Sequence, residues 1–262
     1  MIPLRDQQVL RERFRAELTS RVRIDYFTQK PSSFFIPGRQ DCAFCEDVRV
    51  LMEEVASLSE RISLTVHDID QDKDAVKTHG IDKVPAIVIR GQTNRPLRHY
   101  GVPSGTGFPG FVENLIDAAR GTVVLQPQTV KQLRKLRDDV HLQVLTTPSC
   151  PYSALVARNA AKMALSNNKI RLDIVEVSEF PQMAQRYGVR ATPTTVVNDE
   201  AALPGAMDEA MLLENILRIV EGKPITRPQT PLPATAFQIQ TQEQQGQPQQ
   251  TVTASGLIVP GR

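Results

Sequence analysis

Two cysteines separated by two residues give this chain its clearest chemistry. Cys42 and Cys45 enclose Ala43 and Phe44 at the start of a helical pattern. A thiolate at a helix start meets unpaired amide groups and the positive end of the helix dipole, and both lower its pKa. We expect Cys42 to attack a substrate disulfide as the nucleophile and Cys45 to resolve the mixed disulfide. A static bridge or a pair of buried thiols is the alternative.

The cysteine count argues against a metal site. Only three cysteines occur, and an odd number does not suit a framework of structural disulfides. Zinc bound at Cys42 and Cys45 would need two more thiol or imidazole ligands, and the chain offers only the distant Cys150 and four scattered histidines. We therefore expect no metal and no cofactor, and we prefer the dithiol interpretation.

Two prolines follow the cysteines at the same interval. Pro85 lies 43 residues after Cys42, and Pro193 lies 43 residues after Cys150. Each precedes an apolar strand pattern, where a proline removes a hydrogen-bond donor, so we predict cis peptide bonds that present a backbone edge to an extended substrate. An ordinary proline at the start of a strand is the alternative. The residues expected to contact substrate are Phe44, Val84, Pro85, Tyr152, Thr192 and Pro193.

The chain contains this pattern twice. An offset of 108 residues superimposes Cys42 on Cys150 and Gly80 on Gly188. Ahead of the cysteines the offset is 118, because the first copy carries about ten extra residues within residues 30–39. The repeat indicates two copies of one domain, and the insertion indicates a longer active-site loop in the first.

Each copy alternates helical and strand patterns of apolar residues. The predicted helices cover residues 7–17, 46–60 and 108–119 in the first copy and 130–137, 154–166 and 209–220 in the second. The predicted strands cover residues 22–28, 62–66 and 86–89, then 140–146, 170–175 and 194–197. A short helix that ends at Gly80 or Gly188 precedes each proline. This alternation predicts an α/β fold with helices on both faces of a sheet.

Composition divides the chain into three parts. The break in the pattern at Pro127 predicts domains at residues 1–122 and 123–223. Residues 224–262 are rich in proline and glutamine, and we expect disorder there because little apolar surface can offset the entropy of ordering. A net charge of +2 and the lack of a long apolar stretch argue against nucleic-acid and membrane partners. We expect a cytoplasmic protein, since no signal peptide is recognisable.

Several motifs together resemble a known family. They are Cys42-Ala43-Phe44-Cys45, Val84-Pro85, His99-Tyr100-Gly101-Val102-Pro103-Ser104-Gly105, Thr147-Pro148-Ser149-Cys150-Pro151-Tyr152-Ser153 and Thr192-Pro193. From about residue 5 to residue 222, the chain resembles the protein disulfide oxidoreductases built from two fused thioredoxin folds. The resemblance implies two tandem thioredoxin-like domains, each with a central mixed sheet, and thiol–disulfide exchange on disulfide-containing proteins in cell redox homeostasis.

The resemblance also implies partners. A flavoprotein of the thioredoxin-reductase type would supply electrons, and a relay from such a flavoprotein to a peroxiredoxin is the alternative activity. A peptide-binding module whose thiols are incidental is the competing class of function.

The second copy departs from the family pattern at its second cysteine position. Ser153 stands there, and a hydroxyl cannot resolve a mixed disulfide. Cys150 could be a monothiol site resolved by glutathione or by the first dithiol, a ligand of an iron–sulfur cluster, or a relic kept by packing.

An aspartate in the first predicted strand is a candidate for proton transfer. The resemblance implies that Asp25 is the buried carboxylate that exchanges a proton with the resolving cysteine. Its counterpart in the second copy, Gln143, cannot titrate. An aspartate that faces solvent is the alternative.

Overall fold

The computed structural model describes residues 2–30, 41–93 and 95–226, and the backbone of three two-residue strands further along the chain. Nearly all of the predicted insertion and most of the predicted disordered tail lie outside the described residues. In the described part of the chain, no helix is both long and apolar enough to cross a lipid bilayer.

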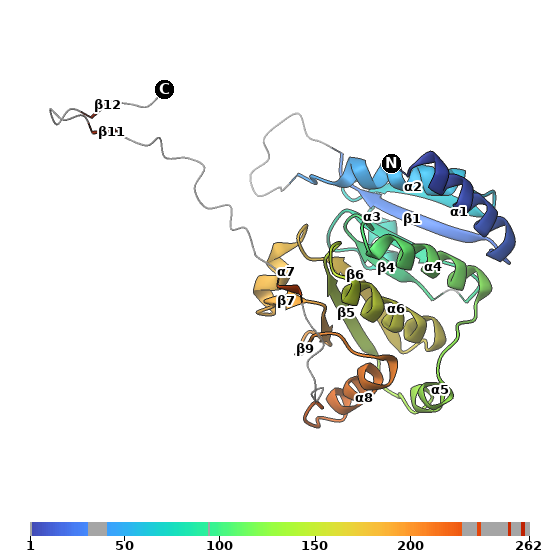
Figure 1. Cartoon of the computed structure of the whole chain (residues 1–262), viewed down its shortest axis with the longest axis vertical. Helices are drawn as coiled ribbons and strands as arrows, with labels where there is room; N and C mark the ends of the chain where they lie inside the picture. Colours follow the sequence, from blue (N-terminus) through green and yellow to red (C-terminus); the bar gives the residue numbers. More distant parts are fainter. Residues whose placement is uncertain are drawn as a thin grey trace.

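One mixed sheet of eight strands runs through the described residues (Figure 1). The strands are β1 (Val22–Thr28), β2 (Ile62–Asp68), β3 (Ala86–Arg90), β4 (Leu97–Tyr100), β5 (Val140–Thr146), β6 (Ile170–Glu176), β8 (Thr194–Val197) and β9 (Ala201–Pro204). Their order is β2-β1-β3-β4-β6-β5-β8-β9. The strands β1 and β5 each pair in parallel with one neighbour and antiparallel with the other. The repeated pairing confirms the duplication and the mixed sheet.

The two copies share this sheet through one pair of strands. Strand β4 of the first copy runs parallel to β6 of the second, with Leu97 opposite Leu172 and Tyr100 opposite Val175. The guanidinium Nε of Arg98 donates to Asp173 Oδ1 at 2.5 Å across this junction, and both side chains are 6% exposed. Because parallel strands end at the same edge, the loops that follow β4 and β6 lie next to each other.

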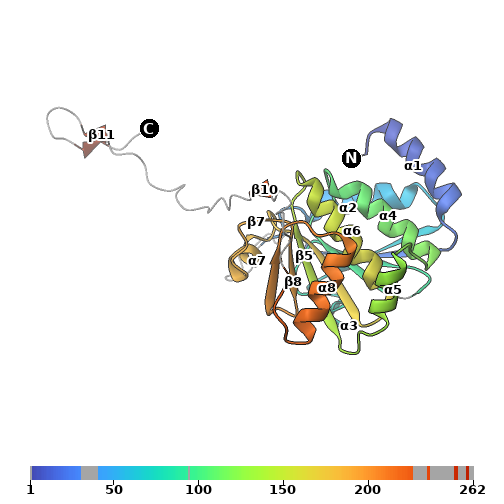
Figure 2. The same ribbon diagram turned by 60° about the horizontal axis from the view of Figure 1, so that its bottom comes forward.

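Helices cover both faces of the sheet, as predicted. They are α1 (Leu4–Glu17), α2 (Cys45–Ser57), α3 (Lys73–His79) and α4 (Gly107–Arg120) in the first copy, and α5 (Pro127–Leu133), α6 (Pro151–Ser166), α7 (Pro181–Arg186) and α8 (Glu209–Val220) in the second. The larger apolar core joins one face of the sheet to α1, α2, α4, α5, α6 and α8. The smaller core joins the other face to α3 and α7. Figure 2 shows α4 and α6 side by side.

The ends of the short helices match the sequence pattern. Helix α3 ends at Gly80, whose φ of 61° lies in the left-handed region that glycine adopts without strain. Gly188 has a φ of 60° at the same place in the second copy. The amide nitrogens of Ile81 and Val189 then close the two turns by bonding to the helices behind them. Both glycines end a helix, as predicted.

The structure corrects several predicted boundaries. Helices α5 and α6 begin at Pro127 and Pro151, earlier than predicted. Backbone amides in the first turn of a helix have no hydrogen-bond partner within the helix, so a proline, which lacks the amide hydrogen, is tolerated there. Pro127 therefore begins a helix instead of interrupting the pattern. Two strands of the eight-stranded sheet were not predicted, β4 and β9. Strand β4 carries Arg98 and His99, which are polar but only 5% and 7% exposed. The division between residues 122 and 123 stays a prediction, and it falls between α4 and α5.

Candidate active site

The dithiol lies at the start of α2 in the first copy. Cys42 and Cys45 are joined as a disulfide, with their Cα atoms 5.5 Å apart. Cys45 is the first residue of the helix and is 3% exposed, whereas Cys42 lies in the preceding turn and is half-buried. Phe44, between them, is 41% exposed. The sulfur that a substrate can reach is therefore that of Cys42, and the sulfur of Cys45 lies underneath.

Cys42 opens into a cleft of about 490 Å³. Three of the residues predicted to contact substrate, Phe44, Val84 and Pro85, line the same cleft. The peptide bond between Val84 and Pro85 is cis, as predicted. The Pro85 carbonyl accepts a hydrogen bond from the amide of Gly101 at 3.0 Å. The structure therefore brings together the nucleophile and all the substrate-contact residues predicted in the first copy.

The second copy contributes the opposite side of this cleft. Glu179, Phe180, Pro181 and Gln182 line it, all from the turn between β6 and α7 and the start of that helix. None of these four residues was predicted from the sequence. A sequence repeat shows which residues occupy equivalent positions in the two copies. It does not show which residues of one copy contact the other copy.

Glu179 has an unusual environment within this group. Its Oε1 accepts the amide of Val102 at 2.7 Å, and its Oε2 is buried without a hydrogen-bond partner among the described residues. Burial raises the pKa of Glu179 to about 7; the Val102 amide opposes this rise, and the charges of Glu176 and Asp47 add to it.

The cysteine of the second copy is enclosed. Cys150 precedes the first residue of α6 and is fully buried, with its Sγ 3.5 Å from the Thr192 carbonyl oxygen. The peptide bond between Thr192 and Pro193 is cis, as predicted, and both residues are buried. Ser153 is 1% exposed, and its hydroxyl has no hydrogen-bond partner in the described part of the chain. Tyr152 is half-buried beside them.

A later segment of the chain lies along the second cis-proline site. Strand β7 (Ala191–Thr192) pairs antiparallel with β10 (Thr235–Ala236), which places Thr235 opposite Thr192. The backbone edge predicted to receive substrate in the second copy is thus paired with the chain's own backbone.

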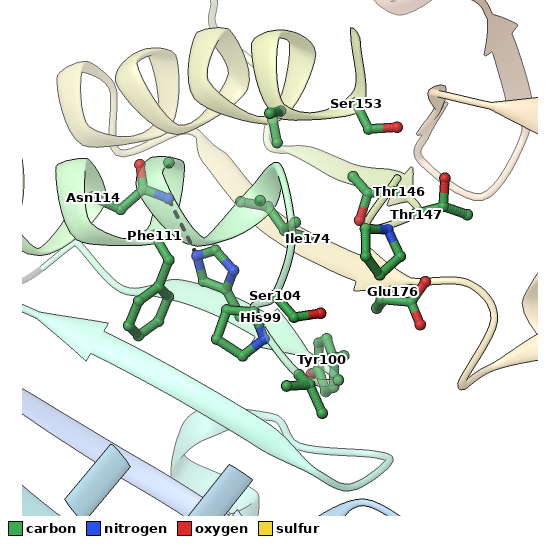
Figure 3. A pocket seen from close by; sticks show the side chains of 18 of the residues that line it. His99, Tyr100, Ser104, Phe111, Asn114, Thr146, Thr147, Ser153, Ile174 and Glu176 are labelled. Carbon is green, nitrogen blue, oxygen red and sulfur yellow. Dashed lines mark hydrogen bonds between the residues drawn. The ribbon is translucent and has the colours of Figure 1, made fainter. Parts of the chain in front are cut away.

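A small, largely apolar cavity of about 50 Å³ lies where the two copies meet, between α4 and α6 (Figure 3). Figure 3 shows His99 of β4 directed toward Asn114 of α4, whose Nδ2 lies 3.2 Å from His99 Nε2. Burial, followed by the nearby Arg158 charge, lowers the pKa of His99 to about 3, so the ring is neutral and its Nε2 accepts from the Asn114 amide. Ser153 lines this cavity, whereas none of the three cysteines does.

The predicted proton shuttle Asp25 is buried within the sheet. One of its carboxylate oxygens accepts Arg90 Nη2 at 2.6 Å, and the other lies 3.2 Å from His67 Nε2. The carboxylate is 8% exposed and does not line the cleft that holds Cys42. Asp25 therefore faces neither solvent nor the cleft. Its role in proton transfer stays a prediction.

The chain is similar to several known proteins. Residues 140–218 match the family described as Thioredoxin domain. A thioredoxin from Methanocaldococcus jannaschii is 31% identical over 78 residues, which cover 29% of this chain and 92% of that protein. A component of the alkyl hydroperoxide reductase of Xanthomonas campestris pv. phaseoli is 25% identical over 168 residues, or 64% of this chain and 30% of that relative.

A solved structure extends the likeness to both copies. The protein disulfide oxidoreductase of Aeropyrum pernix has a TM-score of 0.74 and 26% identity, and the match covers 86% of this chain and 95% of that one. The similar fold of that structure, the thioredoxin relative and the Cys42–Cys45 disulfide all indicate a thioredoxin-type dithiol protein. The chain therefore belongs to the thioredoxin family and is a thiol–disulfide oxidoreductase with two tandem thioredoxin folds.

Proposed function

We propose that the chain reduces disulfides of protein substrates with the dithiol formed by Cys42 and Cys45. The observation that carries this proposal is the cleft, in which a half-buried Cys42 lies with Phe44, Val84 and Pro85 while Cys45 is buried beneath. An accessible thiolate begins exchange, and a sheltered second thiol completes it without competing for the substrate.

In the proposed reaction, an extended segment of substrate lies against Val84 and Pro85 and presents its disulfide to Cys42. The Cys42 thiolate attacks one sulfur, and the other substrate sulfur departs. Cys45 then attacks the Cys42 sulfur and releases the substrate as a dithiol. Phe44 packs on apolar side chains of the substrate, since it is the exposed aromatic ring at the edge of the cleft.

For Cys150 we propose that the thiol is a relic and that the second copy acts as a scaffold. Complete burial of the thiol and the pairing of Thr192 with β10 support this role. Disulfide exchange at Cys150 and binding of an iron–sulfur cluster by Cys150 would each require an accessible thiolate. Ser153 also supplies no second sulfur to resolve a mixed disulfide.

Insulin reduction by the wild type, Cys42→Ser and Cys150→Ser tests the proposal. Loss of reduction in Cys42→Ser alone is the expected result, with Cys150→Ser at the wild-type rate. Loss in Cys150→Ser would instead give the second copy a catalytic thiol. The absence of activity in all three forms would favour the peptide-binding module.

The alternative is an electron relay from a flavoprotein of the thioredoxin-reductase type to a peroxiredoxin. The similarity to a component of an alkyl hydroperoxide reductase supports it, although the chain spans less than a third of that relative's length. Either activity would place the chain in cytoplasmic redox homeostasis. A peroxidase assay in which the reduced chain is the only electron donor distinguishes them, because the relay predicts turnover with a peroxiredoxin and little reduction of insulin.

A further inference from the structure

We propose that Glu179, which belongs to the second copy, is the proton-transfer group of the dithiol in the first copy. This inference rests on the proposed function, because it concerns the proton that Cys42 must lose before it can attack a disulfide.

The position of Glu179 follows from the junction of the two copies. Strands β4 and β6 run parallel, so the turn after β6 that carries Glu179 lies against the turn after β4 that carries Gly101 and Val102. A Cβ atom on Gly101 would lie 3.0 Å from the Glu179 carboxyl carbon, so the carboxyl group occupies space that only glycine leaves open. Glu179 lines both the cleft of Cys42 and an adjoining, largely apolar pocket of about 730 Å³.

The two carboxyl oxygens of Glu179 have different surroundings. Oε1 is held by the Val102 amide at 2.7 Å, and the neighbouring Gly101 amide bonds to the Pro85 carbonyl at 3.0 Å. These two bonds fix the carboxyl group relative to the substrate-contact residues. Oε2 is buried and has no hydrogen-bond partner in the described part of the chain. A buried oxygen without a donor is costly as a carboxylate and gains most from binding a proton.

The charges around Glu179 favour its protonated form. The charged side chains that line the two pockets beside Glu179 come from five segments of the chain. They are Glu176 of β6, Asp47 of α2, Asp6 of α1, Asp41 next to Cys42, and Asp82 and Lys83 just before Val84 and Pro85. Among these groups only Lys83 is a cation, and its Nζ bonds to Asp82 at 2.7 Å and lies 4.0 Å from the centroid of the Tyr100 ring. Burial, together with the charges of Glu176 and Asp47, raises the pKa of Glu179 to about 7, so both forms of Glu179 are populated at neutral pH, as proton transfer requires.

The other carboxylates near the dithiol are less suited to this task. Both oxygens of Asp25 contact basic side chains, Arg90 and His67, and Asp25 does not line the cleft. Both oxygens of Glu176 accept the Ser178 hydroxyl at 2.6 Å, and its Oε2 also accepts the Glu179 amide at 3.1 Å. Glu179, in contrast, lines the cleft and has one carboxyl oxygen without a hydrogen-bond partner among the described residues.

In the proposed step, the Glu179 carboxylate takes the proton of the Cys42 thiol. The thiolate attacks a substrate sulfur, a bond forms between Cys42 and the substrate, and the substrate disulfide breaks. The departing sulfur leaves with the electron pair and receives the proton from Glu179. Cys45 then loses its proton to solvent and attacks the Cys42 sulfur, and the second substrate thiolate takes up a proton. The substrate gains two electrons and two protons, and the enzyme is left with the Cys42–Cys45 disulfide.

The test is the pH profile of single-turnover reduction of a protein disulfide by the reduced full chain. Wild type, Glu179→Gln and the matched control Asp82→Asn are compared from about pH 5 to about pH 9, across the range in which a base near neutrality ionises. Asp82 has the same charge and lines the same cleft, but its side chain is 72% exposed, so solvent screens its charge from Glu179 and its loss leaves the bend in place. We expect the profile of the wild type and of Asp82→Asn to bend near pH 7. In Glu179→Gln the bend is lost, and the rate at neutral pH falls about 100-fold.

Three results would overturn the proposal. If the charge of Glu179 acted only by opposing the Cys42 thiolate, Glu179→Gln would react at least as fast as the wild type. A bend that survives in Glu179→Gln would assign the ionisation to another group. If the wild type and Asp82→Asn reduce no disulfide at all, the proposed function fails and this proposal fails with it. Asp47→Asn gives a second check, because loss of that charge moves the bend to lower pH if the bend belongs to Glu179.

Discussion

Replacing Glu179 by glutamine is expected to stabilise the folded chain above pH 7 and to leave its stability unchanged near pH 4. The pKa of the Glu179 carboxyl is raised from 4.5 to about 7, mainly by burial. Between these values the folded chain holds a proton that the unfolded chain has released, so stability is complete at low pH and declines as pH rises through the folded-state pKa. Glutamine has no charge to bury and escapes this decline.

The size of the effect follows from the same rise in pKa. At about 1.4 kcal/mol for each pH unit, a rise from 4.5 to about 7 corresponds to about 3 kcal/mol above pH 7. Glu179 is only half-buried, and solvent screens part of this cost. We therefore expect Glu179→Gln to unfold with a free energy about 2 kcal/mol larger than that of the wild type at pH 8.

Urea denaturation of the oxidised chain at a series of pH values measures this difference. Asp82→Asn is again the control, and its difference from the wild type is expected to be small because its side chain is 72% exposed. A Glu179→Gln difference that is the same at pH 4 and at pH 8 would refute the reasoning, because the stabilisation would then come from packing and not from the ionisation of the carboxyl group.

Three further predictions concern the junction of the copies and the second site. Asp173→Asn, which leaves Arg98 without its buried partner, is expected to lower the free energy of unfolding by about 3 kcal/mol in urea denaturation. Burial raises the pKa of Asp173, but the His141 and Arg98 contacts outweigh it and lower that pKa, so the wild type loses this part of its stability as pH falls through the folded-state pKa. An equal loss of stability on acidification of the variant would contradict the assignment. In Gly101→Ala, alanine must adopt a φ of 95°, and its Cβ would lie 2.7 Å from the Cβ of Glu176. We expect the free energy of unfolding to fall by at least about 2 kcal/mol and disulfide reduction to slow. A variant as stable as the wild type would show that the turns after β4 and β6 can move apart. Ser153→Cys is expected to form a second disulfide with Cys150 on oxidation, measured as the loss of both remaining titratable thiols of the variant, without raising the rate of insulin reduction. A marked gain in rate would show that the second site is accessible.

The repeat is the part of the fold that sequence reasoning could predict well. The equal intervals from Cys42 to Pro85 and from Cys150 to Pro193 reflect the same order of helix, strand and short helix in both copies, although α2 has 13 residues and α6 has 16. The two cis peptide bonds were predicted from that interval together with the apolar strand that follows each proline, and the order of the elements was predicted from the apolar patterns. Local patterns suffice here because each copy forms its own half of the sheet.

Contacts between the copies were beyond such reasoning. The sequence pattern predicted no strand at β4, which contains the polar residues Arg98 and His99. Both side chains are buried, Arg98 against Asp173 of the second copy and His99 against Asn114 of α4. The place of Glu179 in the cleft also depends on a contact between the copies, because the β4–β6 pairing brings its turn beside Val102. Pairings between segments far apart in sequence have no period, and the residues involved need not be apolar.

The resemblance to a family also drew attention to Asp25, whose partners could not be anticipated. Its position in the first strand was correct, but Arg90 lies across the sheet on β3 and His67 on β2. Ionic partners on neighbouring strands depend on register, which the apolar pattern determines only to within alternate residues.

The continuous sheet has a consequence for how the molecule opens. Chains of two domains joined only by a linker can unfold one domain at a time, whereas here β4 and β6 exchange backbone hydrogen bonds and bury the Arg98–Asp173 ion pair between the copies. Opening either copy alone would expose that ion pair and leave a central strand without its neighbour. The two copies should therefore lose amide protection in native-state hydrogen exchange as one cooperative unit, with the slowest exchange at β4 and β6 and not at the centre of either half.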